Sequence, residues 1–116
     1  MLTIYHNPRC RKSREALQYL KDQNLDVTIV EYLKEPLSKI QLQKILHQIG
    51  LEPSSVLRKN EADWKAIDNR NDLSEDQILD VLTNYPKTLE RPLITSKESG
   101  ILARPLENLI SFLQKN

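Results

Sequence analysis

Short apolar runs and longer amphipathic stretches alternate along this chain, and polar or proline-containing segments separate them. Residues 2–5 and 27–32 are rich in β-branched, aromatic and other apolar side chains, which predicts two strands. From about residue 11, small and apolar residues recur at helical spacing until the polar stretch 21–24, which predicts a helix. Because strands joined by a helix almost always form a right-handed parallel pair, the first third of the chain predicts a β-α-β unit.

The segment from about residue 38 to 85 is predicted to be helical. Two pairs in it have the spacing of a capping box, in which each side chain bonds the other residue's backbone N–H: Ser38 with Gln41, and Ser74 with Gln77. Apolar residues at helical spacing follow both pairs, and Gly50 and Pro86 end the two helices. Shorter helices are expected at 53–57 and 61–67.

The last part of the chain predicts a hairpin and a final helix. Residues 93–95 and 101–103 are short apolar strands, and Gly100 is expected to supply a positive φ in the turn between them. Pro105 stands where the first position of the last helix is expected. The order β-α-β, helices, β-β-α predicts an α/β thioredoxin-like fold with a four-stranded mixed sheet. Since no Gly- or Ser-rich linker interrupts it, we expect a single domain over residues 1–116, with a helical insertion at about 38–85.

The composition bounds the class of protein. Hydrophobic residues make up 39% of the 116 positions and charged residues 28%, as in ordinary globular domains. No run approaches the roughly 18 apolar residues of a membrane span, so no membrane association is expected. One cysteine and two histidines exclude a cysteine-rich zinc site, and we expect no metal. A single free thiol is typical of a reducing compartment, which predicts a cytoplasmic protein.

The only cysteine, Cys10, lies in a strongly basic run, His6–Arg14. This run holds four basic and no acidic residues, whereas the whole chain holds 17 basic and 16 acidic residues. Without the four, 13 basic residues face 16 acidic ones, a net charge of −3. The positive charge is therefore local, which favours a small anionic substrate over a nucleic acid, because a duplex requires a broad basic face.

Cys10 also falls where the first strand gives way to the first helix. Free N–H groups at a helix start favour a thiolate and can hold an oxyanion, so nucleophile and anion site coincide. The alternative, a cysteine that only fills space in a core, is less consistent with the basic neighbours. Ser13 occupies the position of the second cysteine in a C-x-x-C motif, so a catalytic cycle through Cys10 needs an external thiol. The Ser13 hydroxyl either bonds the thiolate or is a simple polar residue of the first helical turn.

Three further arginines occur beside turn residues. Arg58 lies in Leu57-Arg58-Lys59-Asn60, while Arg91 and Arg104 each precede a proline. A guanidinium pairs bidentately with oxyanions, yet each of these residues taken alone is interpreted as a solvated surface charge. Only a family pattern gives them a common role.

The motifs together resemble the glutaredoxin-linked arsenate reductases, the ArsC type of the superfamily that includes the Spx regulators. The resemblance spans nearly the whole chain and rests on four motifs in order: His6-Asn7-Pro8-x-Cys10-x-x-Ser13-Arg14, Leu57-Arg58-Lys59-Asn60, Glu90-Arg91-Pro92 and Arg104-Pro105. It implies that the Cys10 thiolate attacks arsenate, that glutathione attacks the adduct, and that glutaredoxin reduces the mixed species so that arsenite leaves. Glutathione is then a co-substrate, glutaredoxin a partner, no cofactor is bound, and a monomer is expected.

The resemblance also implies roles for individual residues. Arg58, Arg91 and Arg104 correspond to the oxyanion-binding arginines, His6 to a histidine that favours the thiolate, and Pro92 to a cis-proline. Support of the anion loop is expected from Asn7, Arg9, Arg11 and Arg14. The chain departs from the best-known members at Arg11 and Lys12, where those have small residues; the two side chains either strengthen anion capture or block the pocket.

Two alternatives remain open on the sequence. A glutathione-linked thiol oxidoreductase acting on another substrate would have a reactive Cys10 but negligible arsenate turnover. An Spx-like regulator would bind RNA polymerase; many such proteins use a C-x-x-C switch, which Ser13 removes here, and the three arginines favour an oxyanion pocket instead.

Overall fold

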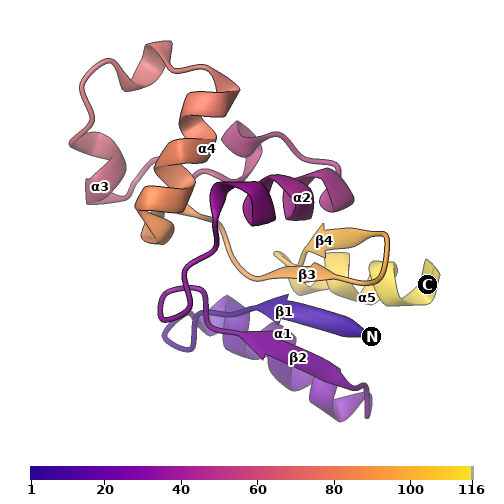
Figure 1. Ribbon diagram of the computed structural model, residues 1–116. Helices are drawn as coiled ribbons and strands as arrows, with labels where there is room; N and C mark the ends of the chain where they lie inside the picture. The colour runs from indigo at the N-terminus through magenta and orange to yellow at the C-terminus, as the bar shows by residue number, and fades with distance from the viewer. Residues whose placement is uncertain (116) are drawn as a thin grey trace. The chain divides into compact units, whose positions relative to one another are not determined.

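The computed structural model describes residues 1–115, and the chain separates into two compact units (Figure 1). The sheet unit contains Met1–Glu35 and the chain from Arg91 onward, and the helical unit is Pro36–Glu90. Each unit has buried residues of its own and is described by itself. Within the described residues, none of the helices has the length and apolar character that a membrane span requires.

The sheet unit has four strands and two helices. Parallel pairing joins β1 to β2, and antiparallel pairing joins β1 to β3 and β3 to β4, which gives the strand order β2-β1-β3-β4. This confirms the predicted α/β fold with a mixed four-stranded sheet and a helical insertion. The elements are β1 (Leu2–Tyr5), α1 (Arg11–Asp22), β2 (Val27–Val30), β3 (Leu93–Thr95), β4 (Gly100–Leu102) and α5 (Leu106–Lys115).

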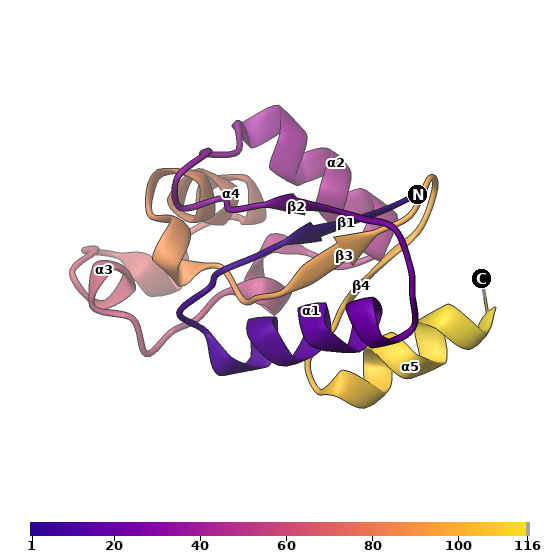
Figure 2. The same cartoon turned by 90° about the horizontal axis from the view of Figure 1, so that it is seen from below.

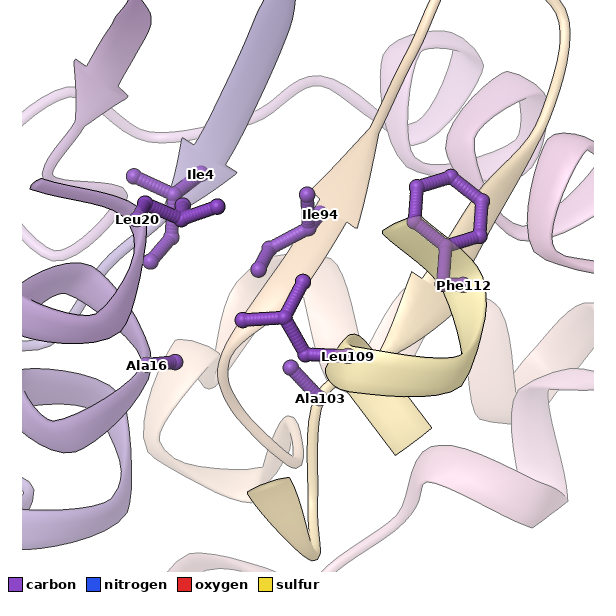
Figure 3. Close-up of a cluster of buried hydrophobic side chains, with 7 residues drawn as sticks. All are labelled: Ile4, Ala16, Leu20, Ile94, Ala103, Leu109 and Phe112. Atoms are coloured by element: carbon purple, nitrogen blue, oxygen red, sulfur yellow. The ribbon is translucent and has the colours of Figure 1, made fainter. Parts of the chain in front are cut away.

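A row of isoleucines crosses this sheet, because the register places one on each strand: Ile29, Ile4, Ile94 and Ile101. Helices α1 and α5 lie side by side on one face of the sheet (Figure 2). Figure 3 shows the core between the helices and the sheet, with fully buried Ile4 and Ile94 facing Leu20 and Leu109. Spacing of three to four residues along each helix puts its apolar side chains on this face.

Leu109→Ala is expected to destabilise the protein strongly. Its side chain is completely buried among the strands and α1, so truncation leaves a cavity that costs about 2–5 kcal/mol of unfolding free energy. Urea denaturation followed by circular dichroism measures the loss. Gln114→Ala, at an exposed position of the same helix, serves as the control. A loss of equal size in both variants would contradict this assignment of the core.

The helical unit follows the predicted order, with shorter helices than expected in its middle. Both capping boxes are present, at Ser38 and Ser74, and Gly50 ends α2 with a φ of 79° in the left-handed region that glycine favours. Trp64 is buried in this unit. The elements are α2 (Lys39–Ile49), η1 (Pro53–Val56), α3 (Ala62–Lys65), η2 (Arg70–Asp72), α4 (Glu75–Asn84) and η3 (Pro86–Thr88).

Four local expectations were wrong. β4 covers Gly100–Leu102, one residue before the predicted strand at 101–103. β2 ends at Val30, two residues before the predicted end. Gly100 does not form the hairpin turn, because it pairs with Thr95 inside the β3–β4 ladder. Ser96 closes the turn instead, through its N–H to the carbonyl of Ser99 at 2.8 Å. Helix α5 begins at Leu106, one residue after the predicted start.

Candidate active site

Cys10 is the N-cap residue of α1, at the end of the loop that leaves β1. Its backbone is extended, its N–H donates to the Asn7 carbonyl at 3.0 Å, and its own carbonyl accepts from the Arg14 N–H at 3.0 Å. The thiol is partly exposed. The first N–H groups of α1 therefore surround a sulfur that a substrate can reach.

The surroundings of the sulfur favour the thiolate. Partial burial raises the pKa of the Cys10 thiol, but hydrogen bonds from the Ser13 N–H, the Arg91 guanidinium and the Lys12 N–H outweigh it, together with the Arg91 charge. The resulting pKa lies below the ordinary value of a cysteine. A second guanidinium is close, since Nη1 of Arg104 lies 3.8 Å from the sulfur.

The Ser13 hydroxyl is directed to other groups. Its Oγ lies 2.6 Å from Nδ1 of His6 and accepts from the Asn7 N–H at 3.1 Å, and all three residues are buried. The contribution of Ser13 to the sulfur is its backbone N–H. The Ser13 hydroxyl thus links the loop before Cys10 to the helix after it, so the chain is held on both sides of the nucleophile.

His6 is held as a neutral imidazole. Burial lowers its pKa; the Glu31 carboxylate opposes this, and the charges of Lys21 and Arg14 add to it. A histidine with a lowered pKa carries little positive charge at neutral pH. We therefore interpret His6 as supporting the thiolate through Ser13 rather than as a nearby cation.

Ser13→Ala is expected to weaken both the fold and the thiolate. Without Oγ, the buried Asn7 N–H and His6 Nδ1 lose a partner, which costs about 1–3 kcal/mol of unfolding free energy. The backbone N–H at this position remains, so the pH midpoint of Cys10 alkylation should rise only slightly. Ser111→Ala, at an exposed position on α5, is the control. Equal stability of the two variants would contradict a supporting role for Ser13.

Strand register brings Arg91 and Arg104 to the same end of the sheet. Leu93 pairs with Leu102, and each arginine lies two residues beyond that pair. The Arg91 carbonyl accepts a hydrogen bond from Nη1 of Arg104 at 3.4 Å. Tyr5, the last residue of β1, also pairs with Leu93, so the loop to Cys10 leaves at the same end. Both arginines precede cis prolines, Pro92 and Pro105.

Arg58 is described within the helical unit, where it has carboxylate partners. Its Nε lies 3.2 Å from a carboxylate oxygen of Glu90, and its Nη1 lies 4.0 Å from one of Glu61. Its N–H donates to the Thr88 carbonyl at 2.7 Å. The structure therefore brings Cys10, His6, Ser13, Arg91 and Arg104 together in the sheet unit and places Arg58 in an acidic setting.

The sequence profile of the ArsC family matches residues 5–112. The chain belongs to the ArsC family. An arsenate reductase of Escherichia coli is 32% identical over 114 residues, covering 97% of this chain and 81% of that protein. An arsenate reductase of Neisseria meningitidis is 34% identical and covers 97% of both chains. The structure of an arsenate reductase from Vibrio cholerae superposes with a TM-score of 0.87 at 32% identity, covering 95% of each chain. The resemblance stated from the motifs is thus confirmed at the level of the family.

Sequence reasoning missed the acidic partners of Arg58 in this ArsC-family chain. Glu90 stands in the motif that includes Arg91, and Glu61 lies three residues after Arg58, a spacing at which opposite charges can meet. The sequence shows Glu61 near Arg58 and Glu90 next to Arg91, but only the fold shows that Glu90 reaches Arg58. Over residues 1–115, His, Cys, Asp and Glu side chains form no group of three or more suited to a metal ion.

The remaining loop residues of the ArsC motif hold the loop or extend into solvent. Asn7 Oδ1 accepts from the Arg9 N–H at 3.0 Å, and Nη1 of Arg14 donates to the Pro8 carbonyl at 3.0 Å. The first turn of α1 contains no acidic residue, and the side chains of Arg11 and Lys12 are exposed. The surface around Cys10 is therefore positively charged.

Proposed function

We propose that this protein reduces arsenate to arsenite, with the Cys10 thiolate as nucleophile and with glutathione and glutaredoxin as the source of electrons. The observation that carries the proposal is the pair of guanidinium groups at the sulfur: Arg91 bonds it, and Nη1 of Arg104 lies 3.8 Å away. Planar, permanently charged guanidinium groups match a tetrahedral oxyanion. They also stabilise the negative charge that develops as the thiolate attacks it.

The chemistry needs two thiol electrons from outside the chain. Attack of the Cys10 sulfur on arsenic forms an S–As bond, and an arsenate oxygen leaves as water after protonation. Glutathione then forms a second S–As bond as another oxygen leaves as water. A glutaredoxin thiolate attacks the glutathione sulfur and breaks its bond to arsenic. The electron pair of that bond stays on arsenic, so that As(V) becomes As(III) while a glutaredoxin–glutathione disulfide forms. Hydrolysis releases arsenite and restores Cys10. Because Cys10 is the only cysteine, this chain cannot supply the second thiol itself.

Protection of Cys10 by arsenate tests the substrate class. Arsenate is expected to slow alkylation by neutral iodoacetamide in a saturable way, because the bound oxyanion covers the sulfur and engages Arg91 and Arg104. Phosphate, a tetrahedral oxyanion that thiols do not reduce, should also protect, and chloride at equal ionic strength is the control. An alkylation rate independent of arsenate concentration would reject the oxyanion site.

A second candidate function is glutathione-linked thiol chemistry on another substrate. The exposed Arg11 and Lys12 beside Cys10 favour it, since they offer positive charge to anionic thiols or disulfides outside a tetrahedral pocket. It predicts fast reaction of Cys10 with glutathionylated test substrates and no protection by arsenate. An Spx-like role predicts co-purification with RNA polymerase. Because Ser13 replaces the second cysteine of the C-x-x-C motif, this chain lacks the second thiol of such a switch.

A further inference from the structure

Four basic residues of the sheet unit flank the nucleophile without an acidic partner. Arg9 precedes the nucleophile, and Arg11, Lys12 and Arg14 follow it at the start of α1. All four side chains are exposed. In the described part of the chain, no carboxylate oxygen lies within 4.0 Å of their nitrogens, and Glu15 of the same helix also stays beyond that distance. We call these four residues the cationic surface.

The charges of the cationic surface are available to an incoming molecule. Nη1 of Arg14 donates to the Pro8 carbonyl at 3.0 Å, so this guanidinium is turned back toward the loop before the nucleophile. The side chains of Arg9, Arg11 and Lys12 make no hydrogen bond to the residues that the structure describes. Consecutive Cα atoms are about 3.8 Å apart, so these three side chains start within about 8 Å of the nucleophile's Cα. At that range their charges act on any anion that approaches the sulfur.

Arsenate has other partners in the proposed reaction. Arg91 bonds the Cys10 sulfur, and Nη1 of Arg104 lies 3.8 Å from it, so two guanidinium groups are present where a small oxyanion would bind. The other small reactant that must reach this sulfur is glutathione. It carries two carboxylates against one ammonium group and is therefore an anion at neutral pH. Charge complementarity thus favours glutathione as the molecule that uses the additional positive charge.

We propose that the cationic surface binds the carboxylates of glutathione and so brings the glutathione thiol to the adduct on Cys10. It raises the rate at which an anionic thiol or disulfide meets the sulfur. The sequence left two roles open for Arg11 and Lys12, capture of the oxyanion or obstruction of its pocket; here they serve the second reactant instead. The inference rests on the proposed function in taking glutathione as the co-substrate.

The reaction of Cys10 with disulfides of different charge tests the proposal without arsenate. The Cys10 thiolate attacks one sulfur, the disulfide bond breaks, and one half leaves as a thiolate while the other stays joined to Cys10. The probes are oxidised glutathione, which is anionic, neutral 2-hydroxyethyl disulfide and cationic cystamine. Because the same thiolate attacks all three, the ratio of their rate constants is independent of the Cys10 pKa. Intact-protein mass spectrometry follows the reaction, since the chain has one cysteine.

The triple variant Arg9→Gln, Arg11→Gln, Lys12→Gln should lower the ratio of the oxidised glutathione rate to the cystamine rate by roughly tenfold at low ionic strength. The ratio for the neutral disulfide and cystamine should fall less. Added salt should bring the wild-type ratio toward that of the triple variant, because salt screens exposed charges. Replacing both arginines by lysine, Arg9→Lys with Arg11→Lys, keeps the charges and should keep the wild-type ratio.

Lys115→Gln is the matched control. It removes one exposed cation at the end of the ten-residue helix α5 that is opposite Arg104, so the ratio should stay at the wild-type value. Circular dichroism verifies folding. If the triple variant does not fold, the double variant Arg11→Gln, Lys12→Gln should show a smaller fall of the ratio in the same direction.

An unchanged ratio in the folded triple variant would overturn the proposal, as would an equal fall in Lys115→Gln. Weaker protection of Cys10 by arsenate with an unchanged disulfide ratio would assign the cationic surface to oxyanion capture. A surface used only by an acidic partner protein would also leave the ratio unchanged, and either result rejects the proposal. The disulfide assay contains no arsenate, so a wild-type protein without arsenate turnover would reject the proposed function and leave the recognition of glutathione to be decided by this test.

Discussion

Cys10→Ser is expected to abolish arsenate reduction, with a loss of at least about a thousandfold in kcat, as when a nucleophile is removed from other covalent catalysts. A serine hydroxyl has no appreciable anionic form near neutral pH, and the N–H groups of α1 and the guanidinium of Arg91 cannot lower its pKa enough to change that. No S–As bond forms, so glutathione has no adduct to attack. NADPH consumption, coupled through glutathione reductase with glutaredoxin present, measures turnover.

Stability provides the control for this variant. Cys10 is partly exposed and makes its backbone hydrogen bonds through atoms that serine keeps, so the unfolding midpoint should remain close to that of the wild type. Arsenate binding to Cys10→Ser, followed by calorimetry, should persist because Arg91 and Arg104 are untouched. Turnover of Cys10→Ser at the wild-type rate would rule out Cys10 as the nucleophile.

The parts of the fold that the sequence predicted well are those fixed by local chemistry. Ser38 and Ser74 begin helices because their side chains accept hydrogen bonds from the N–H groups three residues later. This contact depends only on residues that are close in the sequence. Gly50 ends α2 for an equally local reason, its positive φ. Gly100 shows the limit of this reasoning, since pairing with Thr95 across the hairpin decided its conformation.

The candidate site shows the same division. The sequence could place Cys10 at a helix start, because a strand signal ends just before a helical period begins. The sequence could not predict the hydrogen-bond partners of the Ser13 hydroxyl, since His6 and Asn7 come near it only after the loop folds back. Nor could it join Glu90 to Arg58, 32 positions earlier, because that contact depends on how two turns of the helical unit meet.

Arg91→Ala is expected to cause the second largest loss, roughly a hundredfold or more in kcat/KM at neutral pH, because a charge-assisted bond to a charged group is lost from the site. Its guanidinium bonds the Cys10 sulfur and also lowers the pKa of the thiol by its charge. Without it that pKa rises toward the ordinary value of about 8.5, and the thiolate fraction at neutral pH falls. Iodoacetamide alkylation across pH measures this part directly.

The pH dependence of the Arg91→Ala defect separates its two causes. Above the ordinary cysteine pKa, Cys10 is a thiolate in both proteins, so the part of the defect that comes from protonation disappears there. Whatever remains at high pH measures lost oxyanion binding and should appear as a raised KM for arsenate. Arg104→Ala is the matched variant. Nη1 of Arg104 is 3.8 Å from the sulfur in the wild type, so this variant should shift the alkylation midpoint less than Arg91→Ala and raise the KM comparably.

A defect in Arg91→Ala that is the same at every pH would mean that Arg91 binds the oxyanion and leaves the thiol unaffected. A defect that vanishes at high pH would assign the oxyanion to Arg104 and to the N–H groups at the start of α1.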